Sequence, residues 1–269
     1  MYLAIDIGGT KTLLAQFSAS GELEKSVRFE TPQSYPKFIE ALKACYSEND
    51  FAGEYALCVA GAPGKIDRTK GVGLIFGNLD WRDVPLAEDI AAITGTKTLI
   101  ENDANLAGLS EAILVQDKYR KALYITVSTG IGGVLFVDGR IDPTLADTEI
   151  GHMTFEYEGK MQEWEDFASG KAIFEKYGMP ARDITDPSVW YSISRNIAIG
   201  LVNVISTVSP EVVIIGGGVG SHYEKFKDTL ETEVAIFASE VITVPPIIKA
   251  TRAEEAVLYG CYELAKQQA

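Results

Sequence analysis

The sequence predicts an α/β protein with two similar lobes. Strand-like and helix-like segments alternate along the 269 residues, an order that favours α/β architectures. One pattern occurs twice, at residues 2–17 and at residues 122–137: an apolar strand, a turn containing Gly-Gly and a second apolar strand. A hydrophobic content of 46% can supply a substantial core. Because a short charged stretch at residues 118–121 separates the halves, we expect one lobe over residues 1–117 and the other over residues 118–269.

The first half contains five predicted strands and three predicted helices. Short apolar or alternating runs predict the strands, which are Tyr2–Ile5, Leu13–Phe17, Lys25–Glu30, Tyr55–Ala60 and Thr98–Ile100. Apolar residues at helical spacing predict the helices, which run over Pro36–Ser47, over Leu86–Thr94 and from Asp103 onward. Gly95 stands where a glycine commonly ends a helix, and Gly61–Gly64 predicts a turn after the fourth strand.

The second half continues the alternation. Its first two strands are the two arms of the repeated pattern, and two more are predicted at Glu211–Ile215 and near Ile247–Ile248. Helices are predicted from near Asp186-Pro187, over His222–Ala238 and over Ala253–Lys266. Proline is favoured in the first turn of a helix, so the Asp-Pro pair marks a helix start.

Charge and the length of apolar runs exclude several classes of protein. A net charge of −14 argues against nucleic-acid binding, which needs a basic surface. The longest apolar runs, such as Val212–Ile215, are far shorter than the roughly 18 residues of a membrane span. The chain starts without a basic leader or a small-residue cleavage site, so we expect a cytoplasmic protein. The widely spaced Cys45, Cys58 and Cys261 form no CxxC pair and are interpreted as buried, inert thiols.

The segment Asp6–Thr12 indicates a phosphate site. Its Gly8-Gly9 turn joins two apolar strands and can bring backbone N–H groups against phosphate oxygens. Asp6 immediately precedes this turn and is a candidate magnesium ligand, directly or through water; alternatively, it hydrogen-bonds its own turn. Thr10, Thr129 and Gly130 are further candidate phosphate contacts, although threonine and glycine in turns are commonly structural.

A second candidate group is the carboxylate of Asp103, where a predicted strand gives way to a helix. It is either a general base or a residue that caps the helix, a position where aspartate is common. The neighbouring amides of Asn102 and Asn105 suit recognition of hydroxyl groups and favour the first interpretation. A phosphate donor on one side and an acid/base group on the other form the layout of a phosphoryl-transfer enzyme.

Other motifs narrow the choice. The chain has no GxxxxGK[ST] segment, which argues against a P-loop enzyme, and no GxSxG segment, which disfavours a serine hydrolase. Gly216–Gly220 does not match the dinucleotide pattern GxGxxG. His222 is interpreted as a surface residue, whereas His152 within Glu149–His152 is interpreted as part of either a binding turn or a structural turn.

Together these segments resemble the ROK family of sugar kinases and repressors (repressor, open reading frame, kinase). The resemblance extends over nearly the whole chain in the family's order. It rests on seven segments: Asp6–Thr10, Gly77–Trp81, Glu101–Asn105, Ser128–Gly133, Glu149–His152, Glu165–Gly170 and Val213–Gly218.

The resemblance implies a two-lobed actin/hexokinase-like (ribonuclease H-like) fold with a central cleft. It implies that Asp103 is the catalytic base. It places the sugar contacts at Asn78, Asn102, Glu149, His152 and Glu165. It places the contacts to ATP and Mg²⁺ at Asp6, Gly8, Gly9, Thr10, Lys11, Thr129, Gly130, Gly217 and Gly218.

It also implies a homodimer in which the first lobe binds sugar and phosphate and the second binds the nucleotide and forms the oligomer. The last helix, about residues 253–267, is expected to pack back on the first lobe.

One segment departs from the family. In family members, the histidine that corresponds to His152 is commonly followed by a cysteine-rich zinc motif, CxCGxxGC. Here the following segment, Met153–Trp164, is shortened and contains no cysteine. A structural zinc site of the usual kind cannot form without thiolates. We therefore expect no zinc, and a direct contact from His152 to a sugar hydroxyl. Some N-acetylmannosamine kinases of this family also lack the zinc.

The expected function is transfer of the γ-phosphate of ATP to the 6-hydroxyl of a hexose such as glucose or N-acetylmannosamine. The alternative is a non-catalytic, sugar-sensing regulator on the same fold, although the helix-turn-helix of a repressor would need residues ahead of the first strand. A third alternative is an acetate-type or acyl-phosphate kinase. The set Asn102, Glu149, His152 and Glu165 favours a polyhydroxylated substrate instead.

Overall fold

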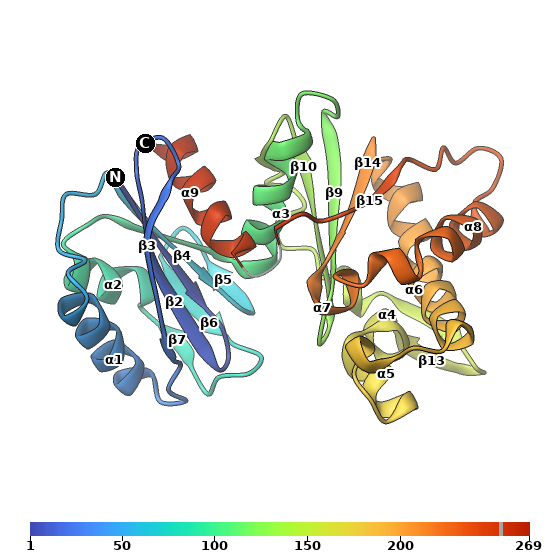
Figure 1. The fold of residues 1–269 in the computed structure, drawn as a ribbon, viewed down its shortest axis with the longest axis horizontal. Helices are drawn as coiled ribbons and strands as arrows, with labels where there is room; N and C mark the ends of the chain where they lie inside the picture. The colour runs from blue at the N-terminus through green and yellow to red at the C-terminus, as the bar shows by residue number, and fades with distance from the viewer. Residues whose placement is uncertain (253–254) are drawn as a thin grey trace. The chain divides into compact units, whose positions relative to one another are not determined.

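The structure is a computed structural model that describes residues 1–252 and 255–269. The described residues form two compact units (Figure 1). The first unit comprises residues 1–110 and 255–269, and the second comprises residues 111–252. Both are mixed α/β, as predicted. The first positions of the predicted closing helix, 253 and 254, lie outside the described residues.

The first unit is built on a five-stranded sheet of order β3-β2-β1-β4-β8. Its strands are β1 (Tyr2–Ile7), β2 (Lys11–Phe17), β3 (Leu23–Glu30), β4 (Leu57–Ala62) and β8 (Thr98–Asn102). β1 pairs antiparallel with β2 and parallel with β4, and β4 pairs parallel with β8. Because parallel strands end at the same edge, the carboxyl ends of β1, β4 and β8 bring their last residues to one side of the sheet.

Helices cover both faces of this sheet, as Figure 1 shows. They are α1 (Tyr35–Glu48), α2 (Leu86–Thr94), α9 (Ala256–Gln268) and the first turns of α3 (Asp103–Val115). Side chains alternate along β1, so Leu3 and Ile5 pack with Phe38 of α1, whereas Ala4 packs with Leu258 of α9. The nearly continuous apolar run of β1 is therefore that of a strand buried on both faces.

Two glycines allow the close approach of helices to this sheet. A Cβ at Gly260 of α9 would lie 1.9 Å from the carbonyl oxygen of Leu106 in α3. A Cβ at Gly61 of β4 would lie 2.7 Å from the Val257 side chain. Both distances are far below van der Waals contact, so only glycine permits this packing of α9 on α3 and on the sheet.

A small second sheet of the first unit was not predicted. It consists of β5 (Lys65–Asp67), β6 (Val72–Ile75) and β7 (Arg82–Val84), in the order β5-β6-β7. The turn predicted at Gly61–Gly64 is also wrong in part, since Gly61 and Ala62 still belong to β4. Tyr55, predicted to start that strand, precedes it and bonds Gln16 through its hydroxyl.

The second unit has a sheet of the same topology, with the order β11-β10-β9-β14-β15. Its strands are β9 (Lys121–Val127), β10 (Ile131–Val137), β11 (Arg140–Ile141), β14 (Val212–Gly216) and β15 (Ile247–Lys249). An antiparallel hairpin again continues into parallel strands, as the repeated sequence pattern indicates. One detail is corrected: the turn is Ser128–Gly130, and Gly132-Gly133 lies inside β10.

Helices of the second unit pack on its sheet around Trp164, Ile197 and Ile215. They are α4 (Trp164–Ala168), α5 (Gly170–Tyr177), α6 (Pro187–Val208), α7 (Gly217–Gly220) and α8 (Lys227–Phe237), with 3-10 turns η1 (Ile150–His152), η2 (Ala181–Asp183) and η3 (Tyr223–Lys225). A hairpin of β12 (Thr154–Tyr157) and β13 (Lys160–Glu163) precedes α4.

The predicted start of α6 is confirmed, because the Asp186 carboxylate accepts the N–H of Ser188 at 2.8 Å. The single helix predicted over His222–Ala238 is wrong. It is divided at Phe226, whose φ of −139° is not helical. Phe226 is buried and stacks on Trp190, with ring centroids 5.5 Å apart. His222, predicted at the surface, is partly buried, and its ring centroid lies 6.0 Å from that of Trp190.

The three cysteines are buried and free, as predicted. No helix within the described part of the chain combines the length and the apolar character that a membrane crossing requires.

Candidate functional site

Asp6 and Asp103 form a carboxylate pair at the carboxyl edge of the first unit's sheet. Asp6 lies near the end of β1, and Asp103 is the first residue after β8. The pKa of Asp6 is raised to about 7, mainly by burial and also by the negative charge of Asp103, while the Lys11 ammonium opposes the rise. The pair therefore has an electrostatic strain that a divalent cation would relieve, and its oxygen ligands suit Mg²⁺.

Asn102, and not Asp103, provides most of the cap of α3. The side-chain oxygen Oδ1 of Asn102 accepts the N–H groups of Ala104 at 2.9 Å and of Asn105 at 3.2 Å, and its Nδ2 donates to the backbone carbonyl of Gly64 at 3.1 Å. Both polar ends of Asn102 are thus engaged within the protein. The predicted contact of Asn102 with the sugar would have to form in addition to these hydrogen bonds.

Asp103 shares a hydrogen-bond donor with Asn102 at the same helix start. Its Oδ1 accepts the N–H of Ala104 at 2.8 Å, a donor that also serves Asn102. Burial raises the pKa of Asp103, and this hydrogen bond opposes the rise. A carboxylate whose pKa is raised toward neutrality is a better proton acceptor, which suits a general base.

Glu101 fixes the backbone around this pair. Its buried carboxylate accepts two bonds from Arg68, Nε to Oε2 at 2.7 Å and Nη2 to Oε1 at 2.5 Å. It also accepts the N–H of Asn102 at 2.7 Å and the amide of Asn105 at 3.0 Å. A bidentate, charge-assisted pair of this kind is rigid. Glu101 therefore holds Asn102 and Asn105 in place, and Asp103 lies between them in the sequence.

We expect Arg68→Ala to lower the free energy of unfolding by about 1–3 kcal/mol, because Glu101 would remain buried without its main partner. Urea denaturation followed by circular dichroism measures this change. Lys70→Ala is the matched control: it removes an exposed pair with Asp67 on the same hairpin and should change stability by less than about 0.5 kcal/mol. Equal effects from the two substitutions would contradict the role assigned to the Arg68–Glu101 pair.

The Gly8-Gly9 turn lies against Asn78. Gly8 donates its N–H to the carbonyl of Lys11 at 2.9 Å, closing the turn between β1 and β2. A Cβ at Gly9 would lie 2.9 Å from the Asn78 Cβ, so the turn and Asn78 are in direct contact. Thr10 and Lys11 follow on the exposed side of the same turn.

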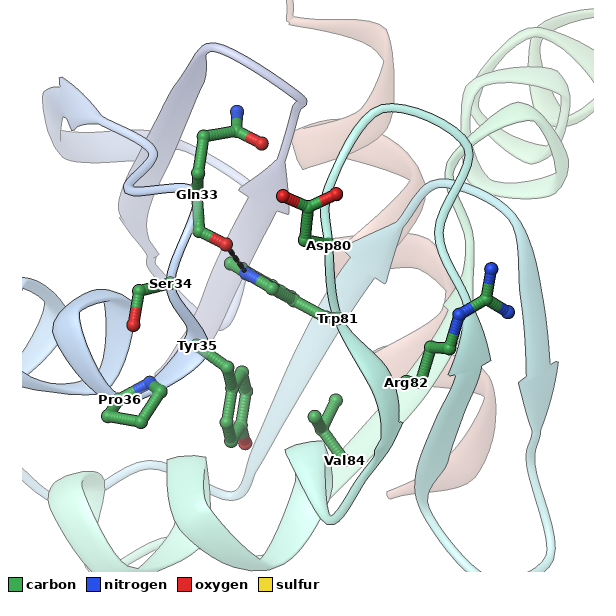
Figure 2. A pocket seen from close by; sticks show the side chains of 8 residues that line it. All are labelled: Gln33, Ser34, Tyr35, Pro36, Asp80, Trp81, Arg82 and Val84. Carbon is green, nitrogen blue, oxygen red and sulfur yellow. Dashed lines mark hydrogen bonds between the residues drawn. The ribbon is translucent and has the colours of Figure 1, made fainter.

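Trp81 anchors the segment that carries Asn78. Its indole N–H donates to the carbonyl of Gln33 at 2.9 Å, the bond drawn in Figure 2. The centroid of its ring lies 4.6 Å from that of Phe38 and 5.2 Å from that of Phe76. A shallow pocket beside it is lined by Gln33, Ser34, Tyr35, Pro36, Asp80, Trp81, Arg82 and Val84. The Trp81 anchor therefore holds Asn78 in place, while Asn78 itself is exposed.

In the second unit, Glu165 joins the Ser128–Gly130 turn to η1. Its Oε2 accepts the N–H of Ile131 at 3.1 Å. A Cβ at Gly130 would lie 2.5 Å from this oxygen, and a Cβ at Gly151 would lie 3.1 Å from it. The structure thus brings together Thr129-Gly130, Gly151-His152 and Glu165.

His152 is held by Glu163, a residue not singled out from the sequence. Nδ1 of His152 lies 2.6 Å from Oε2 of Glu163. This hydrogen bond is the main cause that raises the pKa of His152; burial opposes it, and the charges of Glu165, Glu163 and Glu149 add to the rise. The turn Glu158-Gly159, both residues with positive φ, is a hairpin signal that could have predicted the pairing of Thr154 with Glu163.

Gly217 and Gly218 lie at the end of the second sheet. Gly217 has a φ of +84°, and a Cβ there would lie 2.5 Å from the carbonyl oxygen of Val127, just before the Ser128–Gly130 turn. Within the described part of the chain, no neighbouring atom lies within 4 Å of a Cβ at Gly218. An exposed backbone next to a glycine turn can admit a flat ligand closely.

The donors present do not fit a structural zinc site. Across residues 1–252 and 255–269, the side chains of His152, Glu163 and Glu165 form a group that could hold a metal ion. Each offers one ligand atom, and these atoms lie within 4.8 Å of one another. Yet Glu163 Oε2 is bonded to His152, and Glu165 Oε2 to Ile131. Among the described residues, the group includes no cysteine.

Comparison with known proteins places the chain among sugar kinases and their relatives. The model of the ROK family matches residues 2–268. The N-acetyl-D-glucosamine kinase of Haemophilus influenzae is 25% identical, over 98% of this chain and 99% of that protein.

Two solved structures share the fold. One is a ROK family glucokinase from Streptomyces griseus in complex with glucose and AMPPNP, with a TM-score of 0.82, 22% identity and 99% of each chain covered. The other is a ROK family transcriptional regulator, a homologue of the Escherichia coli MLC protein, with a TM-score of 0.85 and 17% identity, covering 99% of this chain and 77% of that one. These likenesses confirm the predicted actin/hexokinase-like fold.

Proposed function

Because the chain belongs to the ROK family, we propose that it is an ATP-dependent sugar kinase that phosphorylates the 6-hydroxyl of a hexose. The observation that supports this most is the pair of Asp6 and Asp103, whose pKa values are both raised by burial. Transfer of a phosphoryl group to an alcohol requires one group that accepts the hydroxyl proton and another that binds the cation. The two carboxylates can serve these roles.

In this proposal Asp103 accepts the hydroxyl proton while O6 of the sugar attacks the γ-phosphorus of ATP. The bond from the γ-phosphorus to the bridging oxygen breaks, ADP leaves, and the proton stays on Asp103. Asp6 would hold Mg²⁺, directly or through water, and the bound ion would neutralise charge on the phosphates. Alignment of the reacting groups provides much of the remaining rate enhancement.

The other predicted residues fall into a sugar group and a nucleotide group. Sugar hydroxyls are contacted by Asn78, Asn102, Glu149, His152 and Glu165. Phosphates are contacted by the turns at Gly8–Lys11 and at Thr129-Gly130, and the adenosine lies by Gly217-Gly218. We further propose a homodimer, which light scattering after size-exclusion chromatography would test.

The substrate proposed is a hexose such as glucose or N-acetylmannosamine, and N-acetylglucosamine joins the set because the Haemophilus influenzae relative is named for it. A coupled assay of ADP release, run over a panel of hexoses and without sugar, tests the proposal. Sugar-dependent ADP release supports a kinase. Sugar binding by calorimetry without ADP release would instead support the sugar-sensing regulator, for which the likeness to a transcriptional regulator is the motive.

We expect His152→Ala to raise the sugar KM by roughly 3- to 30-fold and to change kcat less, because it removes a hydrogen bond made to bound sugar. Steady-state kinetics at saturating ATP measures both constants. The chain has only one other histidine, so His222→Gln is a matched control that should leave the KM unchanged. A fall in kcat with an unchanged KM would argue against a sugar contact.

We expect the purified protein to contain no stoichiometric zinc. The shortened Met153–Trp164 segment offers no thiolate, and the nearby carboxylates already accept hydrogen bonds. Elemental analysis by mass spectrometry, after purification without chelators, gives the metal content per chain. One tightly bound zinc per chain would overturn the interpretation of this segment.

A further inference from the structure

The ring of His152 is hydrogen-bonded through Nδ1 to the carboxylate of Glu163. An ionised carboxylate can only accept hydrogen bonds, so the 2.6 Å contact between Glu163 Oε2 and His152 Nδ1 requires a proton on Nδ1. In the neutral ring, Nε2 then keeps its lone pair and can accept a hydrogen bond from a hydroxyl group. The contact therefore selects one tautomer and restricts rotation of the ring.

Glu163 is itself held firmly on both sides. Across the hairpin its partner is Thr154, two residues after His152. At the start of α4, the Glu163 side chain accepts the N–H of Asp166, and the Asp166 carboxylate accepts the N–H of Glu163 at 3.1 Å, a reciprocal capping box. The Trp164 N–H also donates to the carbonyl of Met153 at 2.8 Å. These bonds connect the turn of His152 to the helix that carries Glu165.

We propose that Glu163 is a positioning residue, which fixes the tautomer and orientation of His152 and so sets the contact of His152 with the sugar. This inference rests on the proposed function, in which His152 binds a sugar hydroxyl. Glu149 and Glu165 also act on His152 through their charges, whereas Glu163 is the residue that is hydrogen-bonded to the ring.

The same three side chains could instead be considered a metal centre. The observed hydrogen bonds favour positioning, because Nδ1 of His152 and Oε2 of both glutamates already have hydrogen-bond partners in the protein. Nδ1 and Glu163 Oε2 form one bond, and Glu165 Oε2 accepts the N–H of Ile131.

Nitrogen-15 NMR of the imidazole side chains tests the proposal without kinase activity. The chain has two histidines, and His222→Gln assigns the two ring systems. We expect Nδ1 of neutral His152 to be protonated in the wild-type protein. In Glu163→Gln, the population should shift toward the Nε2-protonated form, and the pKa of His152 should fall because a negative partner is lost. The same tautomer and the same pKa in both proteins would overturn the proposal.

Asp166→Asn is the matched control. It weakens the other half of the capping box while leaving Glu163 and His152 in place. A helix-capping effect alone would alter the His152 signals in both variants, and that result would overturn a direct role for Glu163. We expect Asp166→Asn to leave the His152 tautomer unchanged.

Kinetics provides the second readout. We expect Glu163→Gln to raise the sugar KM by roughly 2- to 10-fold, with kcat within about 2-fold, and to have no further effect in a His152→Ala background. If the wild-type chain phosphorylates no sugar, the proposed function fails while the NMR test still stands. If the kinase is active and Glu163→Gln leaves both KM and tautomer unchanged, the positioning role alone fails. Zinc bound to His152 Nδ1 would also overturn it.

Discussion

We expect Asp103→Asn to lower kcat by roughly 10²–10⁴, which corresponds to about 3–5 kcal/mol of transition-state stabilisation, and to change the Kd for sugar by less than about 3-fold. The amide retains the shape of the side chain and an oxygen that can accept the N–H of Ala104, so the start of α3 should keep its structure. It cannot accept the hydroxyl proton. The coupled ADP-release assay measures the rate, and calorimetry measures sugar binding.

The pH dependence of the same two proteins separates a base from a merely structural residue. Burial raises the pKa of Asp103, so its ionised, proton-accepting fraction falls as the pH is lowered toward that pKa. The wild-type kcat should therefore decline on the acid side, and the residual activity of Asp103→Asn should lose that part of the decline. Near-full activity of the variant would mean that another group is the base.

The fold could be predicted wherever local pattern and tertiary environment agree. The apolar run of β1 is buried on both faces, and Gly95 ends α2 with a φ of +67°, where glycine carries no steric cost. The Asp186-Pro187 pair starts α6 as predicted. In each case the residue type itself specifies the backbone conformation, so neighbours distant in sequence need not be known.

The elements that were missed depend on such neighbours. Strands of three or four residues, such as β5 and β7, have too few positions to display a period. Gly132-Gly133 lies in β10 and not in the turn. Residue 133 is a glycine because a Cβ there would lie 2.3 Å from the Ile150 side chain, a contact from another element. Phe226 interrupts a helical pattern because its ring is stacked on Trp190.

The candidate site shows the same division. Asp6 and Asp103 could be selected by their places beside a glycine turn and at a helix start, but their electrostatic interaction requires the parallel order of β1, β4 and β8. The hydrogen bonds of Asn102 are those of a helix cap, and its contact with the sugar stays a prediction. Glu163 was missed because it is 11 residues from His152 in sequence and meets it only through the β12–β13 hairpin.

Asp6→Asn is expected to lower kcat/KM for MgATP by roughly 10²–10³ and to leave sugar affinity nearly unchanged, because it removes a negative charge that holds Mg²⁺ beside the phosphates. Binding of a cation requires the ionised carboxylate, and the pKa of Asp6 is raised to about 7. Magnesium binding at Asp6 must therefore release a proton below that pH.

The affinity of Asp6 for Mg²⁺ should therefore rise with pH. The ionised fraction of Asp6 rises about tenfold between pH 6 and pH 8, since the pKa of about 7 lies midway, so the Mg²⁺ concentration for half-maximal activity should fall by roughly the same factor. Asp6→Asn should lose this dependence. In Asp103→Asn it should move to lower pH, because the charge that helps to raise the pKa of Asp6 is gone. Equal losses of sugar and magnesium affinity in Asp6→Asn would instead mean that Asp6 supports the glycine turn and binds no cation.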